Sequence, residues 1–237
     1  MKKKVIIIVT VVIVVLAISL GGFAYFVSSG LKQEEKLTAE MTELNELVDK
    51  EDYDKNAVKE RLDRVITKGD YAIVEKACKQ YLSDISVIGQ KIDDILSDDS
   101  ISELLSTENY KIDGPEFSNT KKYITETKQS LAELKSNYSE LLTEDKIMSY
   151  ITNKELDSYY ADLYRKELIG DLESEKNDKT VDNAINSVIS LLDNIEKIID
   201  FLIANKNDWH IEGENIVFNS NSSLNKYNEL LENLPMD

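Results

Sequence analysis

Apolar and polar residues follow two different patterns along this chain. An uninterrupted apolar run extends from Val5 to Val27, directly after three lysines. From residue 28 onward, apolar residues instead recur every three to four positions among charged ones, which is the period of a helix with one buried face. The sequence therefore predicts an apolar N-terminal helix followed by a polar, all-α chain.

The apolar run Val5–Val27 is long enough to cross a membrane. As a helix it would extend roughly 34 Å, against about 30 Å of bilayer hydrocarbon. Basic residues beside a first helix favour the cytoplasmic side, so the three lysines orient the span. We expect residues 1–4 to be a cytoplasmic stub, 5–27 a transmembrane signal anchor at the cell membrane, and 28–237 an extracytoplasmic helical domain. With so short a stub, the span would act mainly as a tether.

A cleaved secretory signal peptide is the competing interpretation of the same run. Ser28, Ser29 and Gly30 supply the small residues that a peptidase prefers, and cleavage near Gly30 would make the protein secreted. The apolar core of a signal peptide is usually about 7 to 15 residues long, however, and this run is longer. The uncleaved anchor is therefore favoured.

Two stretches of the polar chain carry an apolar residue at alternating spacings of four and three. A period of 3.5 residues keeps one seam facing a neighbouring helix, as in coiled coils and long bundles. The stretch Thr120–Leu142 repeats this spacing over a shorter length. We expect an elongated bundle in which the seams pair within one chain, or between chains in a homo-oligomer. The seams are Val74, Cys78, Tyr81, Ile85, Ile88, Ile92 and Ile95 within Asp70–Ser97, and Val181, Ile185, Val188, Leu192, Ile195, Ile199 and Leu202 between Asp178 and Lys206.

Shorter apolar repeats predict accessory helices, and turn residues predict where they stop. Asp54 is expected to cap one of these helices, and Ser100 with Glu103 forms the pattern of a capping box. The expected helices are Leu31–Lys50, Lys55–Lys68, Ser100–Ser106 and Thr152–Lys176, and a loop is expected at Asn109–Asn119 around Gly114-Pro115.

The helical period ends after the last long helix. Two short apolar segments flank Gly213 and predict a β-hairpin at about 209–218. An isolated hairpin is marginal in water, so Trp209 and Phe218 are expected to pack it onto the bundle. A terminal helix, capped by Ser222, is predicted at about 222–233.

Charge and cysteine content narrow the possible partners. The chain has 45 acidic and 28 basic residues and a net charge of −17, which disfavours nucleic acid as a partner. The single cysteine, Cys78, cannot form an intramolecular disulfide, and its place on a seam predicts a small buried side chain. This composition is typical of a bacterial cell-envelope protein.

The residue types needed for familiar catalytic and metal sites are scarce. His210 is the only histidine, so a zinc site or a Cys-His nucleophile pair is disfavoured. Acidic residues from Asp52 to Asp63 resemble the spacing of a calcium loop, but Ala57 stands where that loop needs glycine, and Asp54 is better explained as a helix cap. We therefore expect no catalytic residues, cofactor or metal.

Aromatic residues supply the candidate interaction surface. It comprises four tyrosines and the hairpin residues Trp209 and His210, since tyrosine and tryptophan combine apolar area with a polar group. Packing in the core is the competing role, because leucines share the helix that carries the tyrosines. The four tyrosines are Tyr150, Tyr159, Tyr160 and Tyr164.

The expected function is a non-enzymatic protein-interaction or structural module of the cell envelope, with a protein partner. The first alternative is an extracytoplasmic ligand-sensing domain that signals through a partner. A cell-wall hydrolase is the least favoured, because long seams use most apolar residues for self-packing and leave no evident cleft.

The seams generate a direct test. Replacing Ile88 or Ile195 with Asp places an unpaired carboxylate on a seam, so either substitution is expected to unfold the helical domain. Circular dichroism and thermal melting measure the effect. An unchanged melting curve would show that the substituted position does not lie on a packed seam.

Overall fold

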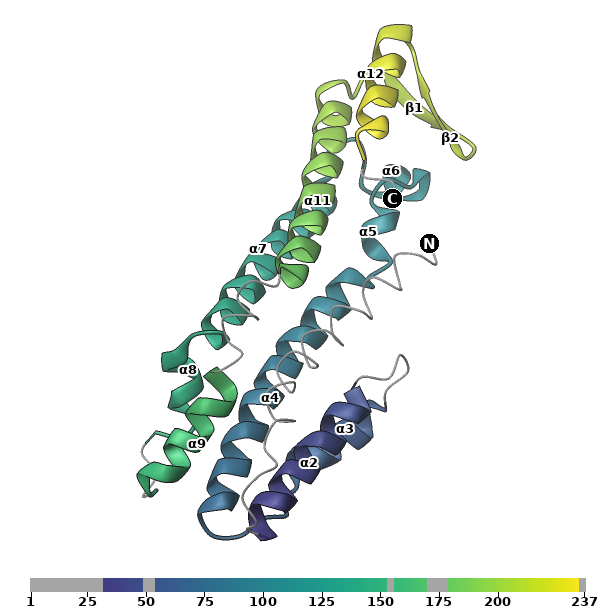
Figure 1. The fold of residues 1–237 in the computed structure, drawn as a ribbon. Coiled ribbons are helices and arrows are strands. Elements are labelled where there is room, and N and C mark those ends of the chain that lie inside the picture. The colour runs from purple at the N-terminus through teal and green to yellow at the C-terminus, as the bar shows by residue number, and fades with distance from the viewer. Residues whose placement is uncertain (1–31, 49–53, 153–155, 170–178, 235–237) are drawn as a thin grey trace. The chain divides into compact units, whose positions relative to one another are not determined.

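The computed structural model describes residues 32–48, 54–152, 156–169 and 179–234. These residues are mostly helical, with one antiparallel hairpin near the C-terminus (Figure 1), which confirms the expected helical class and the hairpin. The expected span Val5–Val27, the cytoplasmic stub before it and the cleavage position near Gly30 lie outside the described residues. Among the helices that are described, none has the length and apolar character needed to cross a bilayer.

The described residues form helices and one hairpin in a fixed order along the chain. In order they are α2 (Lys32–Val48), α3 (Lys55–Asp63), α4 (Asp70–Leu96), α5 (Ser100–Glu103), α6 (Thr107–Asp113), α7 (Ser118–Leu141), α8 (Glu144–Ser149), α9 (Ser158–Ile169), α11 (Thr180–Ala204), β1 (Trp209–Glu212), β2 (Asn215–Phe218) and α12 (Asn221–Glu232).

Contacts divide the chain into two compact units, each made of two separate segments. Unit 1 combines residues up to Asp94 with Leu134–Asp182, and unit 2 combines Ile95–Glu133 with Asn183 and the residues after it. The three longest of the described helices, α4, α7 and α11, therefore contribute residues to both units. Each unit is described below by itself.

The predicted seams match the buried faces of the long helices. In α4, five of the seven seam residues are 0–1% exposed: Val74, Cys78, Tyr81, Ile85 and Ile92. Ile88 and Ile95 are only half-buried. A straight helix drifts by about 20° per heptad relative to a strict 3.5-residue repeat, which explains why Ile95, at the end of the seam, turns away from its partners. In α11, Ile195 is 3% exposed, so it is the stronger of the two positions for testing a seam.

Helix α3 ends earlier than predicted. It stops at Asp63 rather than Lys68, and Arg64 has an extended backbone with φ −87° and ψ 158°. The segment after it gives its backbone amides to a carboxylate on α4, which replaces the helical hydrogen bonds. Gly69 then adopts a φ of +62°, a conformation that favours glycine, at the entry to α4.

The loop predicted at Asn109–Asn119 is largely helical. Helix α6 occupies its first part because Ser106 caps it, with the Oγ accepting a hydrogen bond from the Asn109 amide at 3.0 Å. Helix α7 then begins at Ser118, so only residues 114–117 form the connection. The prediction recognised the turn around Gly114 but overestimated its length.

One predicted capping box, one predicted cap and one predicted helix start are also corrected, whereas α5 does begin at Ser100 as expected. Ser100 does not form a capping box with Glu103, because its amide donates to Asp98 Oδ1 at 2.9 Å instead. The cap of α12 is Ser220, whose Oγ accepts from the Ser223 amide at 3.1 Å, rather than Ser222. Helix α9 begins at Ser158 instead of Thr152, and Lys176, its predicted end, lies outside the described residues.

The hairpin has the predicted place and turn. Trp209 pairs with Phe218 and Glu212 with Asn215, and Gly213 adopts a φ of +61° between the strands. Trp209 is 9% exposed, and the Phe218 ring lies 5.2 Å from that of Tyr227 on α12. Both aromatic residues of the hairpin therefore pack onto helices of unit 2, as expected.

Candidate functional site

Unit 1 contains a cluster of buried charges, which we call the ion cluster. Its centre is Lys79 on α4, whose side chain is 2% exposed. The Lys79 ammonium lies 2.9 Å from Glu40 Oε1 on α2 and 2.8 Å from Glu75 Oε1, and it donates to the Arg64 carbonyl at 3.0 Å. An ammonium has three protons to donate, so these three acceptors match its capacity.

The two carboxylates of the ion cluster hold other parts of unit 1. Glu75 is fully buried and accepts hydrogen bonds from the backbone amides of Ile66 and Thr67 and from the Thr67 hydroxyl at 2.7 Å. Glu40 accepts two hydrogen bonds from Arg64. Glu40 also binds Arg61 of α3 at 3.0 Å. The ion cluster therefore joins α2, α3 and the segment after α3 to α4, which lie alongside one another in Figure 1.

Hydrogen bonds keep both carboxylates of the ion cluster ionised. Burial alone would raise the pKa of Glu40, but hydrogen bonds from Arg64 and Lys79 outweigh it and hold that pKa below its usual value. Burial likewise opposes ionisation of Glu75, and hydrogen bonds from Lys79 and Thr67 lower its pKa. The carboxylates are engaged in holding the fold. Across the described residues, no group of three or more His, Cys, Asp or Glu side chains is arranged to hold a metal ion.

Two of the four tyrosines proposed as an interaction surface lie mainly in the interior of unit 1. Tyr164 is 1% exposed and its hydroxyl donates to the Ile147 carbonyl at 2.9 Å; burial raises its pKa. Tyr150 is half-buried, donates to Asp84 Oδ2 at 2.5 Å and contacts the ring of Tyr81 edge-on. Both side chains therefore serve the packing role.

The other two tyrosines lie on α9 and reach further toward the surface. The Tyr160 ring is half-buried and contacts Tyr71 of α4 edge-on, with ring centres 5.0 Å apart. Tyr159 packs against Tyr160 at 5.2 Å but is 48% exposed. Within this tyrosine group, Tyr159 offers the most area to a partner.

In unit 2, Trp209 and His210 point in different directions, as neighbours on a strand do. The Trp209 indole is buried, stacks on Phe117 at 5.9 Å and donates from Nε1 to the Leu202 carbonyl at 2.8 Å. His210 is exposed, with Nε2 lying 3.0 Å from Glu212 Oε1. They therefore do not share one binding face.

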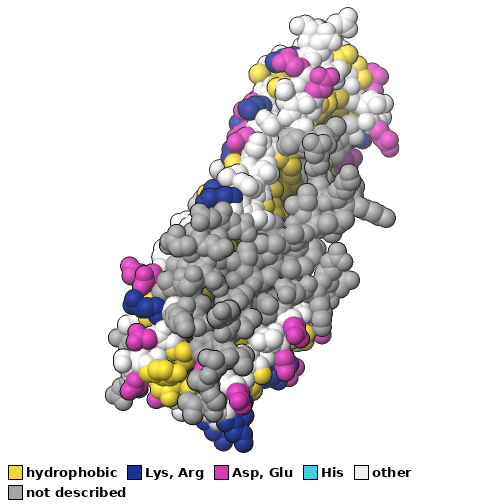
Figure 2. Space-filling view, in the orientation of Figure 1, with side chains coloured by type: hydrophobic (Ala, Val, Ile, Leu, Met, Phe, Trp, Pro, Cys, Tyr) yellow, Lys and Arg dark blue, Asp and Glu magenta, His cyan; other side chains and the backbone are white. Residues whose placement is uncertain are grey.

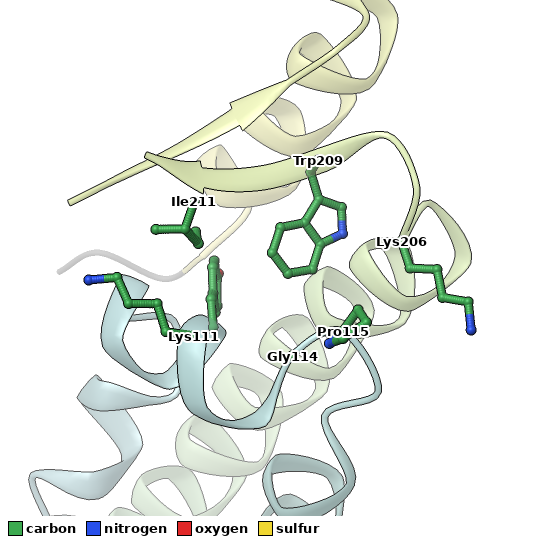
Figure 3. A pocket seen from close by; sticks show the side chains of 7 residues that line it. Lys111, Gly114, Pro115, Lys206, Trp209 and Ile211 are labelled. Carbon is green, nitrogen blue, oxygen red and sulfur yellow. The ribbon is translucent and has the colours of Figure 1, made fainter. Parts of the chain in front are cut away.

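A pocket of about 320 Å³ lies beside Trp209, and we call it the hairpin pocket (Figure 3). This volume is at the lower end of the range of small-molecule sites. Lys111 and Lys206 lie on opposite sides of the pocket in Figure 3. Its walls are formed by Tyr110, Lys111, Gly114, Pro115, Lys206, Trp209 and Ile211.

The turn below the hairpin pocket is held in place by local contacts. Asp113 accepts hydrogen bonds from the amide of Thr120 at 2.7 Å and from that of Asn119 at 3.1 Å. Phe117 is fully buried at a φ of +49°, and a Cβ on Gly114 would approach the Tyr110 carbonyl to 2.4 Å. Only glycine therefore allows the turn to lie this close to α6.

Of the residues that line the hairpin pocket, only Trp209 is among the candidate site residues that the sequence predicts. Tyr110 and Lys111 fall in the predicted loop, and Lys206 was only the expected end of a helix. The nearest sequence signal is Gly114-Pro115, because glycine permits a close approach of the backbone and proline fixes φ, which together favour a rigid turn.

Searches against known protein families, curated proteins and solved structures found no match to this chain.

The ion cluster generates a stability prediction. Glu75→Gln removes the charge opposite a buried ammonium, so we expect the full-length chain to lose about 3 to 5 kcal/mol of unfolding free energy at pH 7. Because the folded pKa of Glu75 lies below its unfolded value, the carboxylate contributes stability above the unfolded pKa and loses it as pH falls through the folded one.

Urea denaturation between pH 7 and pH 3 measures this loss. The difference between wild type and Glu75→Gln should shrink toward the acid end. Glu126→Gln is the matched control, because Glu126 is 65% exposed and its pair with Lys122 spans 3.8 Å, so its stability should change by less than about 1 kcal/mol. Equal stability of the two variants at pH 7 would contradict the structural role of the ion cluster.

Proposed function

We propose that this chain is a membrane-anchored, extracytoplasmic helical protein that acts as a non-enzymatic protein-interaction or structural module of the cell envelope. The observation that carries the proposal is the apolar run Val5–Val27, placed directly after lysines and before an acidic helical chain. A tethered helical domain with a solvated acidic surface is suited to contacting another protein near the membrane.

The charged residues of the ion cluster in unit 1 stabilise the fold, which favours a binding role over a catalytic one. Lys79 pairs with both Glu40 and Glu75, and Glu75 and Lys79 also bond to the backbone, so all three serve the fold. The described surface carries acidic and basic side chains interspersed with apolar ones (Figure 2). Such a mixed surface remains soluble and still offers apolar contacts, among them Ile112 at 74% exposure and Tyr159 at 48%.

Ligand sensing is the second candidate function, and the hairpin pocket is the observation that favours it. Its walls combine aromatic side chains with two lysines in a cavity of about 320 Å³. Small-molecule sites are commonly apolar cavities with a few polar groups at their edge. In this case, binding of a ligand in the pocket would be signalled through a protein partner of the domain.

The proposed orientation predicts a labelling pattern. Cys78 is fully buried, so a maleimide that cannot cross membranes should label wild-type chain only weakly. Ser222→Cys introduces an exposed thiol on α12 and should be labelled in intact bacterial cells. A cysteine inserted between Met1 and Lys2 should be labelled only after permeabilisation.

The reverse pattern would place the helical domain in the cytoplasm and overturn the proposal. Appearance of labelled Ser222→Cys chain in the culture medium, without the N-terminal run, would instead establish cleavage and secretion. Gel shift and mass measurement of the labelled chain distinguish these outcomes.

The proposed interaction predicts a defined complex. A photoreactive phenylalanine analogue at Tyr159 is expected to yield one discrete cross-linked product in intact cells, whose second component recombines with the purified full-length chain at fixed stoichiometry. The same analogue at Ser139, an exposed position of α7, is the control for random collisions.

A product of twice the chain mass would identify the partner as a second copy of this chain. Equal diffuse labelling from Tyr159 and Ser139, with no component that recombines, would contradict the role assigned to this surface. Native mass spectrometry measures the stoichiometry.

A further inference from the structure

The aromatic walls of the hairpin pocket offer carbon surface rather than hydrogen bonds. Trp209 uses its indole N–H on the Leu202 carbonyl, and the Tyr110 hydroxyl is hydrogen-bonded to that of Tyr227 at 3.0 Å. Ile211 and Pro115 add further apolar area to the walls. A guest in this part of the pocket therefore has to be apolar, because a polar group would lose its water without gaining a partner.

The charged groups that line the pocket are both cations. Lys111 lies 3.7 Å from Glu108, which is longer than a hydrogen bond, and Lys206 lies 2.8 Å from Glu116. The two glutamates are 71% and 63% exposed, and ion pairs this open to water contribute little to stability. Either ammonium can therefore turn to an anion in the pocket at small cost.

The charge of the guest is limited by the rest of the chain. The net charge of −17 opposes approach of multiply charged anions such as phosphates. A single carboxylate gains from the nearby lysines while adding the least to that repulsion. The pocket volume of about 320 Å³ suits one aromatic or branched side chain together with such a carboxylate.

Contacts within the protein already hold the walls of the hairpin pocket in place without a ligand. Asp113 fixes the turn by accepting from Thr120 and Asn119, and Gly114 lies against Tyr110 and Trp209 without room for a side chain. A preformed cavity avoids the cost of ordering its walls on binding.

We propose that the hairpin pocket binds an apolar group that carries a carboxylate, with the apolar part against Trp209 and the carboxylate at the pocket edge, where it binds the ammonium group of Lys111 or of Lys206. The carboxyl end of a peptide and a free aromatic acid share this chemistry. The inference rests on the proposed function, because it names what the bound partner or ligand presents to the domain.

Trp209 is the only tryptophan of the chain, so its fluorescence reports on the pocket directly. The full-length chain, held in nanodiscs of zwitterionic lipid, is titrated with 3-phenylpropionate and with its uncharged amide. Two acetyl-Ala-Phe peptides follow, one with a free and one with an amidated carboxyl end. We expect saturable changes with both acids, with Kd about 0.1 to 1 mM, and binding at least five-fold weaker for both amides.

Lys111→Gln/Lys206→Gln should reduce binding of the acids to the level of the amides. Lys226→Gln is the matched control, because Lys226 belongs to the same unit and is paired with Glu229 outside the pocket walls. Far-ultraviolet circular dichroism checks that each variant is folded. Equal affinity for acid and amide, or undiminished acid binding by the double variant, would overturn the inference.

The two arms distinguish the source of the carboxylate. Tighter binding of the free-ended peptide than of phenylpropionate assigns the pocket to a peptide terminus, and the opposite order assigns it to a free acid. The cross-linking at Tyr159 does not depend on the pocket. A failed titration therefore contradicts the pocket ligand without contradicting the proposed function. Loss of the discrete cross-linked product, with acid binding intact, removes the protein-interaction role and favours sensing.

Discussion

The need to bury the apolar seams of the three long helices is the constraint on which the rest of this structure depends. Residues such as Ile85 in α4, Leu131 in α7 and Leu192 in α11 are fully buried, and each belongs to a series that repeats along its helix. A helix with such a stripe is stable in water only when the stripe is covered. The shorter elements are arranged around this requirement: α2 and α3 attach to α4 within unit 1, and the hairpin and α12 attach to the end of α11 within unit 2.

The ion cluster shows how a charge can be accommodated on a helix that otherwise buries apolar residues. Removing an ammonium and two carboxylates from water costs several kcal/mol for each ion, which attraction between them recovers only when the geometry is good and the remaining polar atoms are bonded. Here Lys79 has three acceptors, and both Glu40 and Glu75 accept from several donors. Because apolar residues in these places would pack without any directional requirement, our hypothesis is that the ion cluster selects the alignment of α2 and α3 on α4.

The sequence predicted the features that depend on local periodicity and missed those that depend on distant partners. The extents of α4, α7 and α11 follow from spacing alone, and the hairpin follows from the change of period around Gly213. The end of α3 cannot be predicted from spacing. It depends on Glu75, which lies on another helix and accepts hydrogen bonds from the amides of Ile66 and Thr67. The hairpin pocket could not be predicted for the same reason: Lys111 and Lys206 are nearly a hundred positions apart, and no pattern in the chain relates them. Tyr164 illustrates the same limit, because its spacing fitted both a surface and a core role and only its burial separates them.

Local and long-range electrostatics act differently on the proposed binding role. At physiological ionic strength the screening length is about 8 Å, so most of the acidic residues influence how a charged partner approaches but not how it is held. At contact, the nearest charges dominate, and in the hairpin pocket these are the ammonium groups of Lys111 and Lys206, which are paired with the exposed carboxylates of Glu108 and Glu116. An acidic domain can therefore hold one carboxylate at a site lined by two lysines, while its net charge still discourages polyanions. Selectivity for a singly charged, partly apolar group then follows from three features: lysines at the edge of the pocket, aromatic walls whose indole N–H and hydroxyl are already hydrogen-bonded, and an acidic chain around them.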